Sequence, residues 1–162
     1  MSKRVALVTG GMGGLGTAIC RALAEDGFVV VANCLPGFPQ MEDWLAQNKS
    51  AGFEFHAAEG NVADYASCNE MVKRIESEIG PVDVLVTSAG ILQNATDIAS
   101  FDLAEHDRVW AINYRGVYLS LAEVPLALAL VRFALAIVAL APATLLMGAT
   151  LPTLTRFLTR GE

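Results

Sequence analysis

The stretch Val5-Ala6-Leu7-Val8-Thr9-Gly10-Gly11-Met12-Gly13-Gly14-Leu15-Gly16 decides the fold of this chain. Its apolar start is typical of a buried strand, and the glycine cluster that follows indicates a turn. Apolar residues at helical spacing between Ala18 and Ala24 then predict a helix, which Gly27 closes. Glycines between a strand and a helix let a phosphate approach the backbone beside the positive end of the helix dipole. The context predicts a dinucleotide-binding loop; the alternative is a glycine turn that only packs the helix tightly on the strand.

The alternation of strand and helix continues along the first two-thirds of the chain. Further strands are predicted over 28–32, 53–57 and 82–86, and further helices over 41–47, 64–79 and 104–121, with Asp64 and Asp102 as capping residues. Such alternation forms βαβ units with a parallel sheet and right-handed crossovers. The sequence therefore predicts an α/β fold, a partial Rossmann-like doubly wound parallel sheet of about four strands with an apolar C-terminal helical tail. A fifth strand stays open.

Composition divides the chain into two parts. The 162 residues carry a net charge of −6, yet the stretch 121–158 contains only Glu123, Arg132 and Arg156 as charged residues. We therefore expect a Rossmann-type NAD(P)-binding domain over 1–120 and a hydrophobic tail over 121–162. The absence of a basic run argues against nucleic acid as a partner. Three scattered cysteines and two histidines without ligand spacing predict no disulfide framework and no metal site, and a cytoplasmic location fits best.

The tail contains an uncharged run over 133–155. Its 23 residues are enough to cross a bilayer as a helix, although Pro142 and Pro152 interrupt it. The alternative is a buried core helix plus a strand over 135–140, which would add the fifth strand beside 82–86. Hydropathy alone does not separate these alternatives. A membrane-associated location through the tail therefore stays open beside the cytoplasmic one.

Four landmarks in chain order resemble the short-chain dehydrogenase/reductase family. The family's Thr-Gly-x-x-x-Gly-x-Gly motif begins at Thr9, its adenine-contacting pair is matched by Asn61-Val62, and its Asn-Asn-Ala-Gly motif appears as Thr87-Ser88-Ala89-Gly90. The resemblance covers residues 1–118. It implies that the cofactor is bound by Thr9, Gly10, Gly14, Leu15, Gly16, Asn61, Val62, Ala89 and Gly90. It also implies that Asn113 is the catalytic-helix asparagine, which supports a water relay in the family.

Within the family, residues 1–86 are most similar to acetoacetyl-CoA reductases. The resemblance implies NADPH-dependent reduction of a 3-oxoacyl thioester, and assembly as a homo-oligomer partly through the helix that holds Asn113. The stretch 88–118 looks more like other members of the family. In many dinucleotide folds a carboxylate at the end of the second strand binds the ribose 2′-hydroxyl, but this chain has Asn33-Cys34 there. The missing carboxylate leaves room for a 2′-phosphate, and we expect NADP(H) rather than NAD(H) as the cofactor.

The chain departs from the family at two places. Thr87-Ser88 replaces two asparagines, so the amide hydrogen bonds that brace this loop in the family would be lost. The catalytic serine and Tyr-x-x-x-Lys of the family have no counterpart after Tyr118, because Tyr118 is the last tyrosine and Lys73 the last lysine. A tyrosine without a lysine partner keeps a pKa of about 10 and transfers protons poorly at neutral pH.

The sequence therefore predicts the cofactor-binding half of a reductase, inactive alone, which would act on a 3-oxoacyl thioester only if the missing half were supplied. Two alternatives stay open. One is a membrane-tethered, non-catalytic nucleotide-binding module, indicated by the run over 133–155. The other is a chimeric or frameshifted product, indicated by the change of composition over 119–124.

Overall fold

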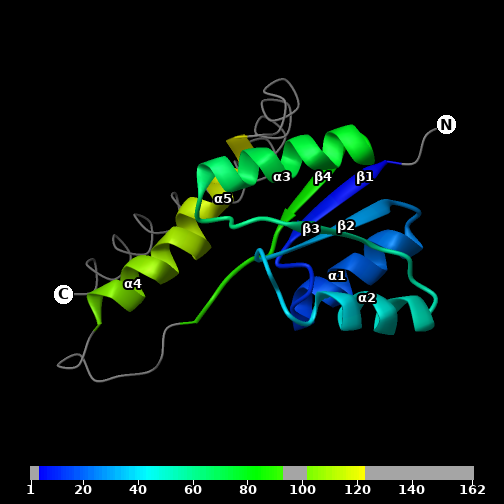
Figure 1. Ribbon diagram of the computed structural model, residues 1–162, viewed down its shortest axis with the longest axis horizontal. Coiled ribbons are helices and arrows are strands. Elements are labelled where there is room, and N and C mark those ends of the chain that lie inside the picture. Colours follow the sequence, from blue (N-terminus) through cyan, green and yellow to red (C-terminus); the bar gives the residue numbers. More distant parts are fainter. Residues whose placement is uncertain (1–3, 93–101, 123–162) are drawn as a thin grey trace, which may run out of the picture. The chain divides into compact units, whose positions relative to one another are not determined.

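A parallel four-stranded sheet in the order β3-β2-β1-β4 forms the centre of the computed structural model (Figure 1). The structure describes residues 4–92 and 102–122, which belong to one compact unit, Met1–Glu123. The strands are β1 (Val5–Thr9), β2 (Val29–Cys34), β3 (His56–Glu59) and β4 (Val82–Thr87). The helices between them are α1 (Gly14–Glu25), α2 (Met41–Ser50) and α3 (Tyr65–Glu78). The predicted α/β fold with a parallel sheet is confirmed.

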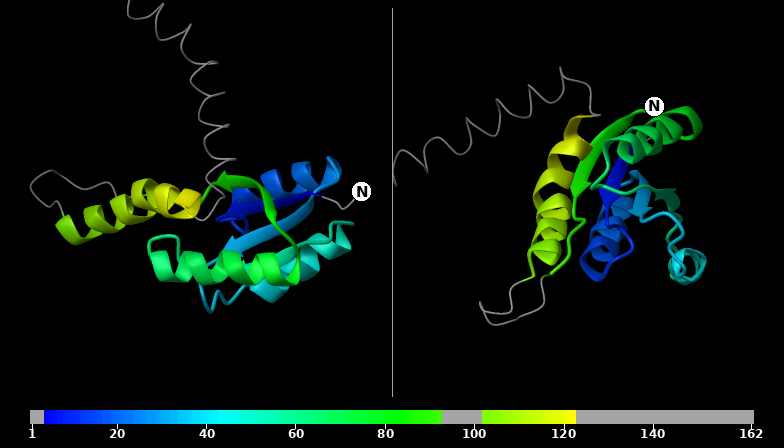
Figure 2. Two further views of the ribbon diagram at one scale, coloured as in Figure 1. Left: turned by 90° about the horizontal axis from the view of Figure 1, so that it is seen from above. Right: turned by 60° about the vertical axis from the view of Figure 1, so that its left-hand side comes forward.

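Helices cover both faces of this sheet (Figure 2). On one face, α1 and α2 contribute Cys20 and Trp44 to a buried cluster with Val8 and Val30. On the other face, α3 contributes a second buried cluster with Leu7 and Val31 of the sheet. Because both faces are covered, β1 is buried along its whole length. The strand order also reverses at β1, so the fold has a topological switch point between β1 and β4.

The third strand begins later than its sequence pattern predicts. The alternation over 53–57 predicts a strand from Phe53, whereas β3 starts at His56. Phe53 and Phe55 instead stack on each other with ring centroids 5.8 Å apart, and Phe55 stacks on Trp44 of α2 at 5.3 Å. The alternating pattern over 53–57 thus arises from aromatic packing against α2 as well as from strand pairing.

The helix predicted over 104–121 consists of three segments, α4 (Leu103–Trp110), the π-helix η2 (Ala111–Arg115) and α5 (Gly116–Ala122). The capping residues of both later helices are confirmed. Asp64 accepts a hydrogen bond from the Ser67 N–H, and Asp102 accepts one from the Ala104 N–H, each at 2.9 Å. The π segment is a departure from the prediction, and such segments often lie at functional sites.

No helix within residues 4–92 and 102–122 is long and apolar enough to cross a membrane. The predicted span over 133–155 and the alternative strand over 135–140 lie outside the described residues.

Candidate functional site

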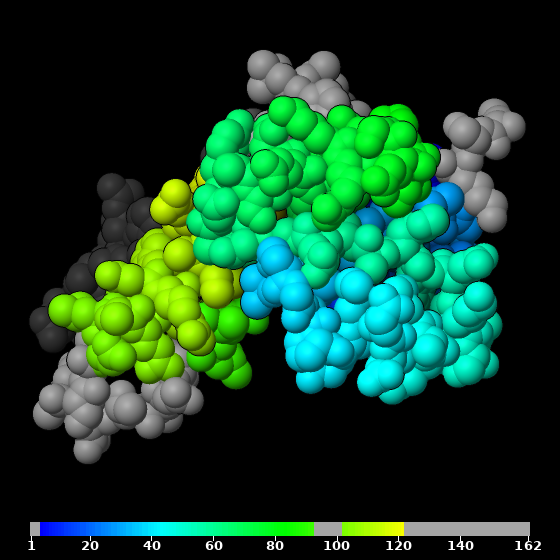
Figure 3. Space-filling view, viewed as in Figure 1, coloured from blue at the N-terminus to red at the C-terminus, as the bar shows by residue number. Residues whose placement is uncertain are grey.

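A recess lies at the carboxyl ends of the parallel strands, the edge at which open α/β sheets bind ligands. In the space-filling view, the loop after β2 and the segment after β4 lie on either side of it (Figure 3). Of the predicted cofactor-binding residues, Gly10, Asn61, Val62, Ala89 and Gly90 line the recess. Asn33 and Cys34, which the sequence places where the cofactor ribose is expected, line it as well. Sequence reasoning missed four further lining residues, Leu35, Gly60, Ile91 and Ile112. Strand ends that are distant in sequence thus converge on one site.

The glycines of the first loop serve two different purposes. Gly10 has a φ of +63°, and a Cβ there would lie 2.7 Å from the Ala89 Cα. A Cβ on Gly16 would collide with the Gly10 carbonyl oxygen and lie 2.8 Å from the Gly11 Cα. Tight packing therefore accounts for Gly10 and Gly16. A Cβ on Gly14, in contrast, would meet no protein atom within 4 Å, so packing does not account for this glycine.

The amino end of α1 offers backbone donors to a ligand. Its capping position is Gly13, which has no side chain to accept a hydrogen bond from the first turn. The N–H groups of Gly14, Leu15 and Gly16 stand in that first turn, where a helix provides no internal acceptor. The Leu15 side chain is 72% exposed and leaves the turn open. Free N–H groups and the helix dipole together favour an anion at this point.

Asn33 ties the glycine loop to β2 and β3. Its side chain is only 2% exposed, and its Oδ1 accepts a hydrogen bond from the Gly10 N–H at 3.3 Å. Its Nδ2 donates to the carbonyl oxygens of Ala58 and Gly60, at 3.1 and 2.9 Å. The Gly11 N–H also donates to the Asn33 carbonyl oxygen at 3.0 Å. Asn33 therefore fixes the shape of the recess with a side chain that is already fully engaged.

The loop after β4 is braced by two predicted site residues. Thr9, which is buried, accepts hydrogen bonds through its Oγ1 from the N–H groups of Ser88 and Ala89, at 3.1 and 3.2 Å. Asn113 accepts one from the Ile91 N–H at 2.9 Å and donates one to the Ile91 carbonyl at 2.8 Å. Thr87-Ser88, in place of the family's two asparagines, predicted a loss of hydrogen bonds that brace this loop. Thr9 and Asn113 provide hydrogen bonds to the loop instead. The water-relay role of Asn113 stays a prediction.

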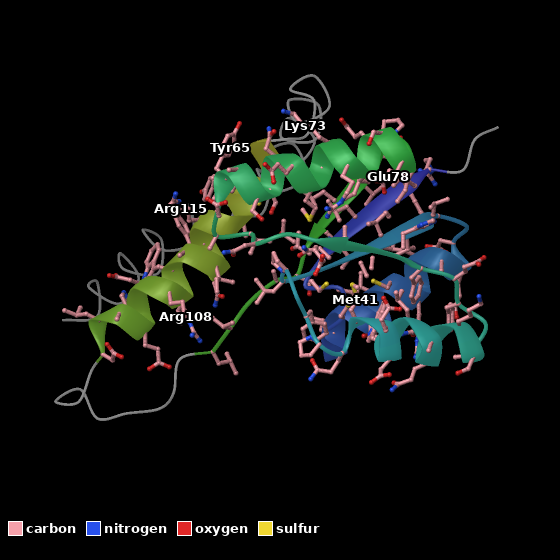
Figure 4. All side chains as sticks on the ribbon, in the orientation of Figure 1. Met41, Tyr65, Lys73, Glu78, Arg108 and Arg115 are labelled. Carbon is pink, nitrogen blue, oxygen red and sulfur yellow. The ribbon has the colours of Figure 1, made fainter. Side chains whose placement is uncertain are left out.

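The tyrosine and lysine side chains of the described residues do not form a proton-transfer pair at the recess. Lys73 is exposed on α3 and points away from the sheet (Figure 4). Tyr114 and Tyr118 are 52% and 58% exposed, and their ring centroids lie 5.1 Å apart. The hydrogen bond with Tyr118 raises the pKa of the Tyr114 hydroxyl. That direction is opposite to the one that prepares a tyrosine for proton transfer at neutral pH.

Fold and recess together define an α/β protein with a doubly wound parallel sheet, and comparison with known proteins gives its family. The family model for short chain dehydrogenases matches residues 4–132, and the chain belongs to this family. The chain is 52% identical over 118 residues to nodulation protein G of Azospirillum brasilense, covering 73% of this chain and 48% of that protein. It is 55% identical over 94 residues to the acetoacetyl-CoA reductase of Cupriavidus necator, covering 58% of this chain and 38% of that protein.

A solved structure also matches this fold. A blue fluorescent protein from a metagenomic library, in complex with NADPH, superposes with a TM-score of 0.65 at 30% identity. The match covers 76% of this chain and 50% of that protein. The chain therefore spans about half the length of the relatives that it matches, and the likeness to acetoacetyl-CoA reductase that residues 1–86 predict is confirmed.

The residues present fit a nicotinamide dinucleotide. The recess has a volume of about 160 Å³, below the roughly 300–1,000 Å³ of pockets that enclose a whole drug-sized ligand. It is therefore sized for one part of a dinucleotide. The space above Gly14 and the donors of the first α1 turn lie beyond it, where a pyrophosphate would be held.

Proposed function

We propose that this chain is the cofactor-binding half of an NADPH-dependent short-chain reductase of 3-oxoacyl thioesters. The observation that carries the proposal is the combination of an uncapped α1 amino end with a Gly14 that packing does not require. The identity to an acetoacetyl-CoA reductase supports the thioester as the substrate class. The NADPH in the matching solved structure, and the lack of a carboxylate on the end of β2, support NADP(H) over NAD(H).

In this proposal each part of the cofactor meets a different part of the site. The N–H groups of Gly14, Leu15 and Gly16 hold the pyrophosphate, and Asn61 and Val62 line the recess that takes the adenosine. Ala89 and Gly90 form the wall toward the nicotinamide side of the switch point. The bound cofactor supplies the hydride, and these residues only bind and orient it.

The same proposal holds that the chain by itself does not reduce a thioester. Lys73 is exposed on α3, and Tyr114 has a pKa raised by its neighbour, so neither prepares a proton for a substrate carbonyl. With NADPH and acetoacetyl-CoA, the purified chain should show no oxidation of the cofactor, followed by the absorbance of the reduced nicotinamide. Turnover that depends on enzyme concentration would overturn this part of the proposal.

A substitution at Gly14 tests cofactor binding separately from the stability of the fold. We expect Gly14→Val to weaken NADPH binding by about tenfold or more, because the added side chain would stand where the pyrophosphate is proposed to bind, in space that no protein atom fills. The thermal midpoint should stay within about 2 °C of the parent chain. Fluorescence titration with NADPH, paired with a thermal melt, measures both quantities.

The matched control is Ala51→Val, which adds apolar bulk at an exposed residue just after α2. It should bind NADPH like the parent chain. Unchanged binding by Gly14→Val would contradict the proposed pyrophosphate position. No saturable binding by the parent chain would contradict the proposed function itself.

We also propose that the chain forms a homo-oligomer through α4, η2 and α5. Trp110, Tyr114 and Tyr118 make an exposed aromatic stripe, with the Trp110 and Tyr114 ring centroids 4.7 Å apart. Asp107 and Arg115 flank this stripe, and an antiparallel second copy would place the two opposite charges against each other. Light scattering should report an oligomer that Trp110→Ser with Tyr114→Ser converts to a smaller species. Equal masses for both proteins would exclude the stripe as the interface.

A further inference from the structure

Glu59, the last residue of β3, reaches the loop that follows β2. One oxygen of its carboxylate accepts a hydrogen bond from the Gly37 N–H at 2.6 Å. Gly37 has a φ of +70°, which marks a tight turn in the connection between Cys34 and Met41. The carboxylate therefore has a fixed position at the tip of this loop.

The loop borders the end of the recess that belongs to β2. Cys34 and Leu35 line the recess, and so does Gly60, the residue next to Glu59. Burial raises the pKa of the Cys34 thiol, and the charge of Glu59 raises it further, in agreement with a carboxylate close to this wall of the recess. In Rossmann-type folds the end of the second strand faces the 2′ position of the adenosine ribose.

The chain that follows β2 carries negative but no positive side chains up to the first turn of α2. The connection over 35–40 contains no lysine or arginine, and the first turn of α2 carries Glu42 and Asp43. Arg74 brings one positive charge from α3, where its Nη2 donates to the main-chain carbonyl of Glu59 at 2.9 Å. A 2′-phosphate placed here would thus meet a fixed carboxylate on β3, although β2 itself ends without one.

We propose that Glu59 sets the discrimination between NADP(H) and NAD(H), by lowering the affinity for the cofactor that carries a 2′-phosphate. This inference rests on the proposed dinucleotide site. It assigns to β3 the carboxylate that dinucleotide folds often carry on β2, and it limits how strongly the chain prefers NADP(H). The carboxylate acts through its charge, while its hydrogen bond to Gly37 keeps that charge in place.

Glu59→Gln tests the charge without removing the hydrogen-bond acceptor for Gly37. We expect the NADPH dissociation constant to fall by about three- to tenfold, since a like charge near the phosphate is removed. The NADH dissociation constant should stay within about twofold of the parent value, because NADH has no 2′-phosphate. The gain for NADPH should shrink in about 0.5 M salt, where exposed charges are screened. Fluorescence titrations with both cofactors at both salt concentrations provide these values.

Two further variants separate charge from loop positioning. Glu54→Gln removes the same charge from an exposed residue before β3, and should leave both dissociation constants unchanged. Glu59→Ala also removes the acceptor for Gly37. If Glu59→Gln behaves like the parent chain while Glu59→Ala weakens both cofactors, the residue only positions the loop and the inference is overturned.

The inference can also fail separately from the proposed function. A parent chain that binds NADPH and loses it on Gly14→Val, but shows no change in cofactor preference on Glu59→Gln, overturns the inference alone. A parent chain that binds neither cofactor overturns both.

Discussion

Replacing Gly16 by alanine is expected to destabilise the described unit by about 3 kcal/mol, a large part of the stability of a small domain. The added Cβ would collide with the Gly10 carbonyl oxygen and crowd the Gly11 Cα, which lies 2.8 Å away. Both neighbours are backbone atoms, so the loop itself has to move. Urea unfolding followed by the fluorescence of the buried Trp44 measures the free energy of unfolding.

Gly14→Ala is the matched control for this prediction. It stands two residues away in the same first turn of α1, but its added Cβ meets no protein atom within 4 Å. Its free energy of unfolding should therefore change by less than about 1 kcal/mol. Equal losses for the two variants would show that the crowding at Gly16 does not determine the stability of the loop.

Replacing Asn33 by leucine is expected to cost about 3–4 kcal/mol of unfolding free energy. The variant leaves the Gly10 N–H and the carbonyl oxygens of Ala58 and Gly60 without their side-chain partner in a buried place. It also releases the glycine loop from β3, so NADPH binding should weaken in parallel. Urea unfolding and cofactor titration on one sample measure both effects.

Asn33→Asp has nearly the same shape and a different charge. Its new oxygen would face the carbonyls of Ala58 and Gly60, which repel a carboxylate, so the pKa of the introduced acid should be raised in the folded state. An acid with a raised folded-state pKa leaves stability intact below its unfolded value of about 4 and loses it as the pH rises. The variant should therefore be more stable at pH 4 than at pH 7 relative to the parent chain (about one to two kcal/mol). No such difference would mean that the side chain leaves the position described for Asn33.

The strand and helix order was accessible from the sequence because it depends on local patterns. The run Val5–Thr9 before a glycine cluster, and the capping residues Asp64 and Asp102, each act within a few residues of themselves. The start of β3 was not accessible in the same way. Phe53 and Phe55 alternate as strand residues do, but their rings pack on Trp44, and only the three-dimensional arrangement shows this.

The sequence predicted the site residues that belong to a recognisable motif. It did not predict the roles of residues that are placed by hydrogen bonds to distant parts of the chain. Gly10, Asn61 and Gly90 belong to segments with recognisable patterns and do line the recess. Asn33 bonds to Gly60, 27 residues away, and Glu59 bonds to Gly37, 22 residues away. These contacts depend on a strand order and register that the sequence does not state. A search for a carboxylate on the second strand alone does not find Glu59, because this residue lies on the third strand.

Two hydrogen bonds between Asn113 and Ile91 join the helical segment η2 to the loop after β4, although the two segments are separate along the chain. Ile91 and Ile112 are walls of the recess, and Trp110 and Tyr114 stand on the outer side of the same helical turns. A ligand in the recess and a partner on the aromatic stripe would therefore contact opposite sides of the same helical turns.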